Sequence, residues 1–282
     1  IVEPSGVVEW QNLYDRFKQQ ILRSLRSSNT PSHIIYPATV EQLSGAIAFA
    51  HKHNHRVLVC GAGSKLAWGN PTKNVQLAIG TQRLNRLIEH AQGDLTVTVE
   101  AGIRFADLQA TLAKSGQFLA IDPAYADKAT IGGIVATGNT GSLRHRYNSV
   151  RDMCIGISFV RSDGELVKAG GRVVKNVAGY DLMKLLTGSY GTLGAIAQVT
   201  FRVYPLAAAS ATVVLTGNVA SISQARSEIL MSSLTPARLD LLSGNLLDML
   251  GIDSDCDRGL GLVARFDSIA KSTTQQSDRL AE

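Results

Sequence analysis

The sequence contains little cysteine. Its three cysteines, Cys60, Cys154 and Cys256, are widely spaced along 282 residues. An odd and scattered set does not form a disulfide framework, and no Cys-x-x-Cys pair is present to hold zinc or an iron–sulfur cluster. This usage favours a reducing compartment, so we expect a cytoplasmic protein without a metal centre of its own.

Other absences narrow the class further. No apolar run is long enough to cross a bilayer, and the polar, amphipathic N-terminal stretch lacks the pattern of a signal peptide. The net charge is +5, but no basic run is interleaved with aromatic residues, so nucleic acid is not an expected partner. A modest positive charge suits an anionic cofactor, an acidic substrate or an acidic partner.

Apolar periodicity and turn signals predict a mixed α and β chain. Thr39 and Gln42 form a predicted capping box, and Asp181 a predicted helix cap. The predicted helices cover residues 9–28, 39–53, 105–115 and 181–186, and the predicted strands cover 56–60, 75–79, 95–100, 155–160, 165–168 and 195–204.

The composition changes after Pro205. Small residues at 207–211 predict a linker, followed by strands at 212–215, 238–242 and 261–266 and helices at 221–232 and 269–282. This order indicates the start of an α+β domain.

Three glycine-rich segments carry the functional signal. The first, Cys60-Gly61-Ala62-Gly63-Ser64-Lys65, directly follows a predicted strand. Small residues there allow successive backbone N–H groups to converge on an anion. Leu66 replaces the third glycine of a dinucleotide-binding fingerprint, and no Gly-Lys-Ser/Thr of a P-loop occurs. A simple turn without a ligand is an equal alternative.

The other two segments are residues 129–138 and 188–196. The former is both small and apolar, which suits a flat ring lying against backbone, with tight strand–helix packing as the alternative. In the latter, Gly188, Gly191 and Gly194 precede a long strand, where they favour either bulges or room for the far end of a long ligand.

Together these segments resemble the FAD-binding domain of the vanillyl-alcohol oxidase / p-cresol methylhydroxylase (PCMH) superfamily, and within it the FAD-binding E subunits of glycolate oxidase. The resemblance covers residues 37–204. Its most specific part is Lys175-Asn176-Val177-Ala178-Gly179-Tyr180-Asp181-Leu182, followed by Gly188-Ser189-Tyr190-Gly191. Tyr190 stands where the D subunits usually carry Glu. Ser149-Val150-Arg151-Asp152 and Gly63-Ser64-Lys65 also match the E subunits.

The resemblance implies an α+β fold in three parts. Residues 1–32 would be a helical extension, 33–205 a PCMH-type FAD-binding domain of two α/β subdomains, and 206–282 the start of an incomplete, ferredoxin-like cap domain.

The resemblance also implies the residues that hold FAD. The pyrophosphate loop would be Gly61, Ala62, Gly63, Ser64 and Lys65; the wall along the ribityl chain and isoalloxazine would be Pro123, Thr130, Ile131, Gly132, Gly133, Ala136, Thr137 and Gly138; and the adenosine end would lie at Gly191, Leu193, Gly194 and Ile196. Members that bind FAD covalently through the first loop carry His near position 64. Ser64 therefore implies non-covalent FAD.

The implied partners are a D-type flavin subunit and an iron–sulfur F-type subunit, with glycolate as substrate and membrane contact only through the complex. Two alternatives stay open. One is a stand-alone FAD-linked oxidase of another hydroxy acid or alcohol, and the other is a scaffold subunit that binds FAD weakly or not at all. The sequence identifies no catalytic base.

Several charged residues have competing interpretations. Arg144, Arg146 and Tyr147 could contact a substrate carboxylate or a partner, with a solvated basic loop as the alternative. The pair Arg151 and Asp152 is expected to form a structural ion pair at a strand start. His51, His53 and His55 are expected to be a solvated helix end rather than a metal site.

Overall fold

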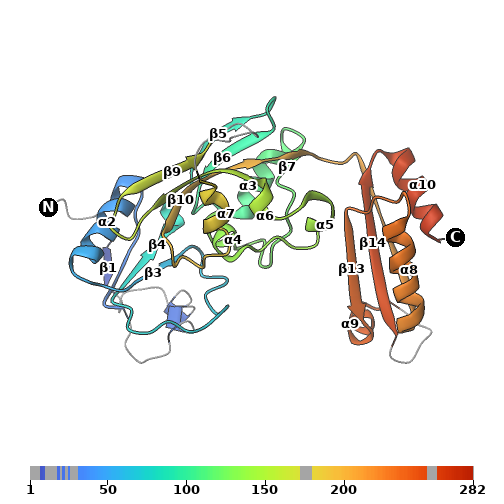
Figure 1. Cartoon of the computed structure of the whole chain (residues 1–282), viewed down its shortest axis with the longest axis horizontal. Coiled ribbons are helices and arrows are strands. Elements are labelled where there is room, and N and C mark those ends of the chain that lie inside the picture. The colour runs from blue at the N-terminus through green and yellow to red at the C-terminus, as the bar shows by residue number, and fades with distance from the viewer. Residues whose placement is uncertain are drawn as a thin grey trace. The chain divides into compact units, whose positions relative to one another are not determined.

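A computed structural model describes residues 7–9, 18–19, 21–22, 25, 31–171, 180–252 and 259–281. The chain divides into two compact units (Figure 1). The first comprises residues 1–119, 123–140 and 149–204, and the second comprises 120–122, 141–148 and 205–282. The boundaries expected from the sequence, at 33 and 205, stay predictions.

The first unit begins with a four-stranded sheet in the order β1-β2-β4-β3. Its strands are β1 (Val7–Glu9), β2 (His33–Ile35), β3 (Val57–Cys60) and β4 (Leu77–Gly80). Strands β2, β4 and β3 run parallel, joined between β2 and β3 by helix α2 (Val40–Lys52). Thr39 caps this helix, because its Oγ1 accepts a hydrogen bond from the Gln42 backbone N–H at 3.2 Å.

The first unit also contains an antiparallel five-stranded sheet in the order β5-β6-β10-β8-β9. Its strands are β5 (Leu87–Ala91), β6 (Thr96–Glu100), β8 (Cys154–Val160), β9 (Leu166–Gly170) and β10 (Ala195–Arg202). Shorter elements are η2 (Thr81–Arg83), α3 (Phe105–Ala113), β7 (Gln117–Phe118), α4 (Ile131–Thr137), α6 (Val150–Met153), α7 (Leu182–Leu186) and β11 (Tyr204–Pro205).

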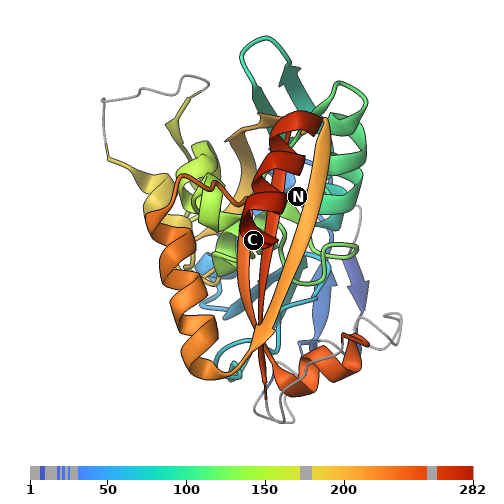
Figure 2. The ribbon, with the colours of Figure 1, turned by 90° about the vertical axis from the view of Figure 1, so that its right-hand side faces the viewer.

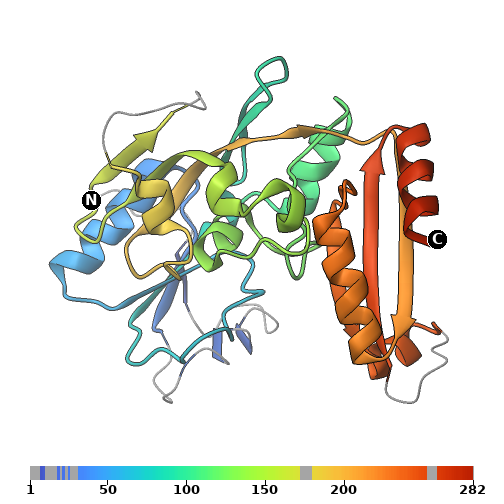
Figure 3. The ribbon, with the colours of Figure 1, turned by 45° about the vertical axis from the view of Figure 1, so that its right-hand side comes forward.

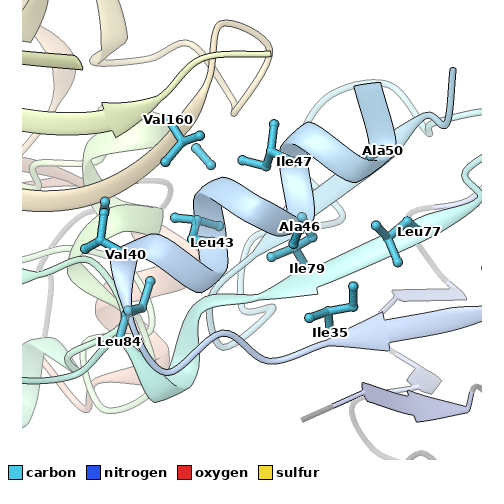
Figure 4. Close-up of a cluster of buried hydrophobic side chains, with 12 residues drawn as sticks. Ile35, Val40, Leu43, Ala46, Ile47, Ala50, Leu77, Ile79, Leu84 and Val160 are labelled. Atoms are coloured by element: carbon cyan, nitrogen blue, oxygen red, sulfur yellow. The ribbon is translucent and has the colours of Figure 1, made fainter. Parts of the chain in front are cut away.

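Helix α2 packs between these two sheets and gives them one core (Figure 4). Its Leu43 is fully buried and belongs to the same cluster as Ile79 of β4 and Val160 of β8. Burial of each such side chain stabilises the fold by about 1.5–3 kcal/mol. The core therefore fixes the first sheet, the helix and the second sheet as one body.

The second unit is a three-stranded antiparallel sheet in the order β12-β14-β13. Its elements are α5 (Arg144–Tyr147), β12 (Ala209–Gly217), α8 (Val219–Met231), β13 (Arg238–Ser243), α9 (Gly244–Met249), β14 (Leu260–Ser268) and α10 (Ala270–Ala281). Strands β12 and β13 flank β14 and are joined through α8, which is a split βαβ arrangement. Helices α8 and α10 lie beside this sheet (Figure 2 and Figure 3). Apolar residues of both helices belong to a buried cluster with apolar residues of the strands.

The structure confirms the α+β fold class and corrects several sequence-based elements. Glu9 ends β1, whereas the sequence pattern predicts a helix start there; most of the remainder of predicted helix 9–28 lies outside the described residues. Residues 209–211 are not a linker, because they pair with β14 as part of β12. Strand β10 ends at Arg202 rather than at Tyr204.

Asp152 also differs from expectation. Its carboxylate accepts hydrogen bonds from the backbone N–H and the hydroxyl of Ser149, at 3.0 and 2.6 Å, so it closes a capping box at the start of α6. The expected pairing with Arg151 at a strand start is replaced by this helix cap. Asp181, by contrast, is confirmed as the N-cap of α7, where it accepts from the Lys184 backbone N–H.

None of the helices within the described ranges has both the length and the apolar character needed to cross a bilayer.

Candidate functional site

The three glycine-rich segments meet around one cavity of about 370 Å³ in the first unit. The segments come from the loop after β3, from α4 and its N-cap, and from the loop that leads into β10. The sequence-predicted residues that line the cavity are Gly61, Ala62, Gly63, Ser64, Lys65, Thr130, Gly132, Gly133, Ala136, Thr137, Gly191, Gly194 and Ile196. Segments far apart in sequence are thus brought together.

Close backbone contacts hold the segments in place. A Cβ atom at Gly61 would lie 1.9 Å from Thr130 Oγ1, and one at Gly132 would lie 2.8 Å from Ala101 Cβ. The Gly132 N–H donates to the Ala101 carbonyl at 2.7 Å, and the Tyr190 N–H donates to the Ala136 carbonyl at 2.7 Å. Tight packing therefore explains why positions 61 and 132 are occupied by glycine.

Other glycines leave room beside the backbone. A Cβ atom at Gly191 would meet nothing within 4 Å, and one at Gly133 would approach only Thr130 Oγ1, at 3.2 Å. Both glycines line the cavity, and a side chain at either position would not meet a clash as severe as those at Gly61 and Gly132. The space that they leave open belongs to the cavity.

The first loop presents free backbone donors. The N–H groups of Ala62, Gly63 and Ser64 donate hydrogen bonds to none of the other residues that the structure describes. Gly63 has a φ of +74°, a left-handed conformation that glycine adopts without steric cost. Successive N–H groups in such a turn form a nest that attracts anions.

Lys65 adds a buried positive charge beside this nest. The residue is 6% exposed, and its Nζ has no hydrogen-bond partner in the described parts of the chain. Burial lowers the pKa of the Lys65 ammonium to about 8. The described lining of the cavity includes no carboxylate, so this cation is without a counter-charge there. An anionic ligand would supply one.

Several lining residues were not among those predicted to hold FAD. They are Leu58, Val59, Cys60, Leu66, Trp68, Gly69, Asn70, Thr72, Thr81, Ala101, Tyr190 and Thr192. Trp68 is the most informative, because its ring centroid lies 5.7 Å from Lys65 Nζ, within cation–π range. Its proximity in sequence to the first loop was the only available signal.

Some predicted site residues lie elsewhere. Pro123, Ile131 and Gly138 do not line the 370 Å³ cavity, and Ile131 is fully buried. Leu193 lines a neighbouring cavity of about 350 Å³, together with His51, His55 and Arg161. The two cavities share Val59, Gly191, Thr192 and Gly194 as lining residues.

The basic segment Arg144–Tyr147 is a helical turn in the second unit and not the expected loop. Arg146 donates through Nη1 to the Thr235 carbonyl at 2.9 Å. Its expected contact with substrate or partner stays a prediction.

Residues 31–170 match the family model described as "FAD binding domain". The chain carries a PCMH-type FAD-binding domain. FAD is the cofactor of this domain.

Curated relatives share the FAD-binding domain at moderate identity. The glycolate oxidase subunit GlcD of Bacillus subtilis (strain 168) is 30% identical over 75% of this chain and 45% of its own length. The glycolate oxidase subunit GlcE of Escherichia coli (strain K12) is 33% identical over 71% and 55%. The mitochondrial D-lactate dehydrogenase [cytochrome] of Arabidopsis thaliana is 30% identical over 77% and 38%. The chain thus spans about half the length of these relatives or less.

Solved structures show the same fold. An alkyldihydroxyacetonephosphate synthase aligns with a TM-score of 0.80 at 18% identity, covering 100% of this chain and 62% of that one. A single-residue variant of the berberine bridge enzyme aligns at 0.71 and 18%, covering 98% and 56%. At this identity the likeness concerns the fold alone.

Proposed function

We propose that this chain binds FAD in the 370 Å³ cavity and serves as a subunit that oxidises glycolate, a 2-hydroxy acid, to glyoxylate. The observation that carries the proposal is the convergence of the three glycine-rich segments on one cavity that holds free backbone donors and an uncompensated lysine. Relatives named for glycolate and D-lactate support 2-hydroxy acids as the substrate class.

The dimensions and chemistry of the cavity suit FAD. Its volume falls in the range of about 300–1,000 Å³ typical of cofactor sites. The pyrophosphate would lie on the N–H groups of Ala62–Ser64 and beside Lys65. The flavin end would follow the small residues of α4, and the adenosine end would follow Gly191–Ile196, where the two cavities adjoin.

FAD, when bound, supplies the two-electron acceptor for a substrate CH–OH group. The residues of this chain bind and orient that cofactor. Oxidation of glycolate to glyoxylate releases two electrons and two protons, and electron delivery onward requires a carrier. We assign no catalytic base to a residue of this chain.

The first experiment is an anaerobic absorption spectrum of the purified full-length protein, recorded before and after glycolate is added. A flavin spectrum that is bleached by glycolate supports the proposal, and D-lactate in a parallel sample measures substrate preference. A flavin spectrum unchanged by every 2-hydroxy acid would contradict oxidation by this subunit. A colourless protein that also fails to take up added FAD would instead favour the scaffold alternative.

We further propose that the subunit works in a complex with a D-type flavin subunit and an iron–sulfur F-type subunit, in the cytoplasm and in contact with the membrane only through that complex. The three scattered cysteines of this chain cannot hold an iron–sulfur cluster. We expect glycolate to bleach the flavin of the isolated full-length subunit only slowly, so its glycolate-dependent dye reduction should be weak, and we expect strong activity after co-expression with both sister subunits. Co-purification of all three is the second measurement. Rapid dye reduction by the isolated subunit would favour the stand-alone oxidase.

We predict that the flavin is held without a covalent bond. Cys60 lines the cavity, but burial raises the pKa of its thiol to about 12, so the nucleophilic thiolate is suppressed. Histidine is absent from the described lining of the 370 Å³ cavity, and Ser64 stands in the loop where covalent members carry histidine. Acid precipitation should release all flavin into the supernatant. Yellow colour retained in the washed pellet would contradict this prediction.

A further inference from the structure

Lys65 is the sole charged side chain among the described residues that line the 370 Å³ cavity. Its Nζ is buried and has no hydrogen-bond partner within the described chain, although a buried ammonium without a partner is costly. Within the described structure, its favourable contact is with the Trp68 ring, whose centroid lies 5.7 Å from Nζ. Such a contact compensates only part of the lost hydration.

The adjacent loop points to the missing partner. Lys65 directly follows the three N–H groups of Ala62, Gly63 and Ser64 that donate to no described residue. A nest and a neighbouring ammonium without a counter-charge form one anion site. FAD carries two negative charges on its pyrophosphate. The buried cation of this cavity is opposite in charge to that anionic centre and would lie beside it.

We propose that the ammonium of Lys65 neutralises the FAD pyrophosphate and that only this protonated form binds tightly, so that cofactor binding takes up a proton whenever Lys65 is neutral. The proposal rests on the placement of FAD proposed above and adds a residue-specific pH linkage to it. The lysine is thus a positioning and affinity residue for the cofactor, separate from any role in substrate oxidation.

The sign of the linkage follows from the environment. Burial places the pKa of Lys65 near 8 in the free protein, and an adjacent phosphate favours the ammonium and raises that pKa in the complex. FAD affinity should therefore be constant below about pH 7, begin to fall near pH 8, and fall by about tenfold per pH unit above about pH 9, until the pKa of the complex is reached.

Other titratable groups at the cavity do not reproduce this behaviour. Cys60 of β3 and Tyr190 of the loop before β10 are the further titratable residues among its described lining. Burial raises the pKa of the Cys60 thiol to about 12, and burial together with Cys60 raises the pKa of neighbouring Tyr36 to about 12. Deprotonation of Cys60 or Tyr36 would weaken FAD binding only at still higher pH.

The test is an FAD titration of the apoprotein, followed by flavin fluorescence from about pH 6.5 to pH 9.5. We expect the wild-type dissociation constant to rise about fivefold between pH 8 and pH 9. Lys65→Arg should bind tightly with a flat profile, because guanidinium stays charged over this range. Lys65→Met should bind about tenfold or more weakly at pH 7, also with a flat profile.

Lys73→Met is the matched control, since Lys73 is exposed and does not line the cavity but carries the same charge. It should keep the wild-type pH profile and so accounts for effects of pH on free FAD. Calorimetry at about pH 8.5 in buffers of different ionisation enthalpy should show proton uptake in wild type and none in Lys65→Arg.

Two results would overturn the proposal: a flat wild-type profile, or a Lys65→Met variant that matches wild type in affinity and profile. If Lys65→Met does not fold, the contrast between wild type and Lys65→Arg still decides. A different result is expected if FAD does not bind at the loop after β3 at all. In that case FAD would bind a Gly63→Val variant as well as it binds wild type.

Discussion

The Gly63→Val variant should lose its flavin and keep its fold. Gly63 sits at φ +74° in the loop after β3, and a β-branched residue is strained there by about 1–2 kcal/mol. The loop would shift to relieve this strain, and the N–H groups of the nest would no longer converge on one anion. Loss of one hydrogen bond to a charged phosphate costs about 1.5–3 kcal/mol, or about 10- to 100-fold in affinity.

Two measurements test this prediction. The ratio of visible to ultraviolet absorbance gives the flavin content per protein, and far-UV dichroism reports whether the fold is kept. Gly116→Val is the matched control: Gly116 also has a positive φ, +66°, with open space around its Cβ position, but lies after α3 and outside the cavity lining. It should suffer similar backbone strain and retain FAD. Full flavin occupancy in Gly63→Val would show that the loop is only a turn.

Two neighbouring glycines of α4 should respond in opposite ways to the same substitution. In Gly132→Val the new side chain meets Ala101, whose Cβ lies 2.8 Å from the ideal Cβ position and whose carbonyl lies at 3.1 Å. Overpacking of this kind costs about 1–3 kcal/mol of stability. In Gly133→Val the side chain meets only Thr130 Oγ1 at 3.2 Å and otherwise occupies the cavity.

Gly132→Val should therefore lower the melting temperature of the apoprotein, whereas Gly133→Val should leave it close to wild type and abolish FAD binding. Thermal unfolding of both apoproteins and FAD titration of both variants provide the comparison, and each variant controls for the helix propensity of the other. Undiminished FAD affinity in Gly133→Val would place the cofactor elsewhere.

Local sequence patterns predicted the helices, strands and caps whose formation depends on residues close together in sequence. The capped helix α2, the strands β8 and β9 and the Asp181 cap follow from residues close together in sequence. Glycine composition located the three segments because close approach to the backbone requires a residue without a side chain. The resemblance supplied their assignment to one cofactor.

What the sequence could not predict depends on contacts between distant residues. Gly132 is required by Ala101 in the turn after β6, and neither residue signals the other locally. The short strand β2 is too brief for a periodicity signal and exists because β1 and β4 pair with it on both sides. Trp68 and Thr81 reach the cavity through tertiary folding, so a glycine pattern could not identify them.

Helix α2 has a consequence for the energetics of cofactor capture. Its buried residues contact both sheets of the FAD-binding domain. The loop after β3 and the loop before β10 are therefore attached to strands of one packed core. Their separation is set by helix packing rather than by the ligand. The apoprotein is accordingly preorganised: FAD need not assemble its own binding surface, and little of its interaction energy is lost in ordering the chain.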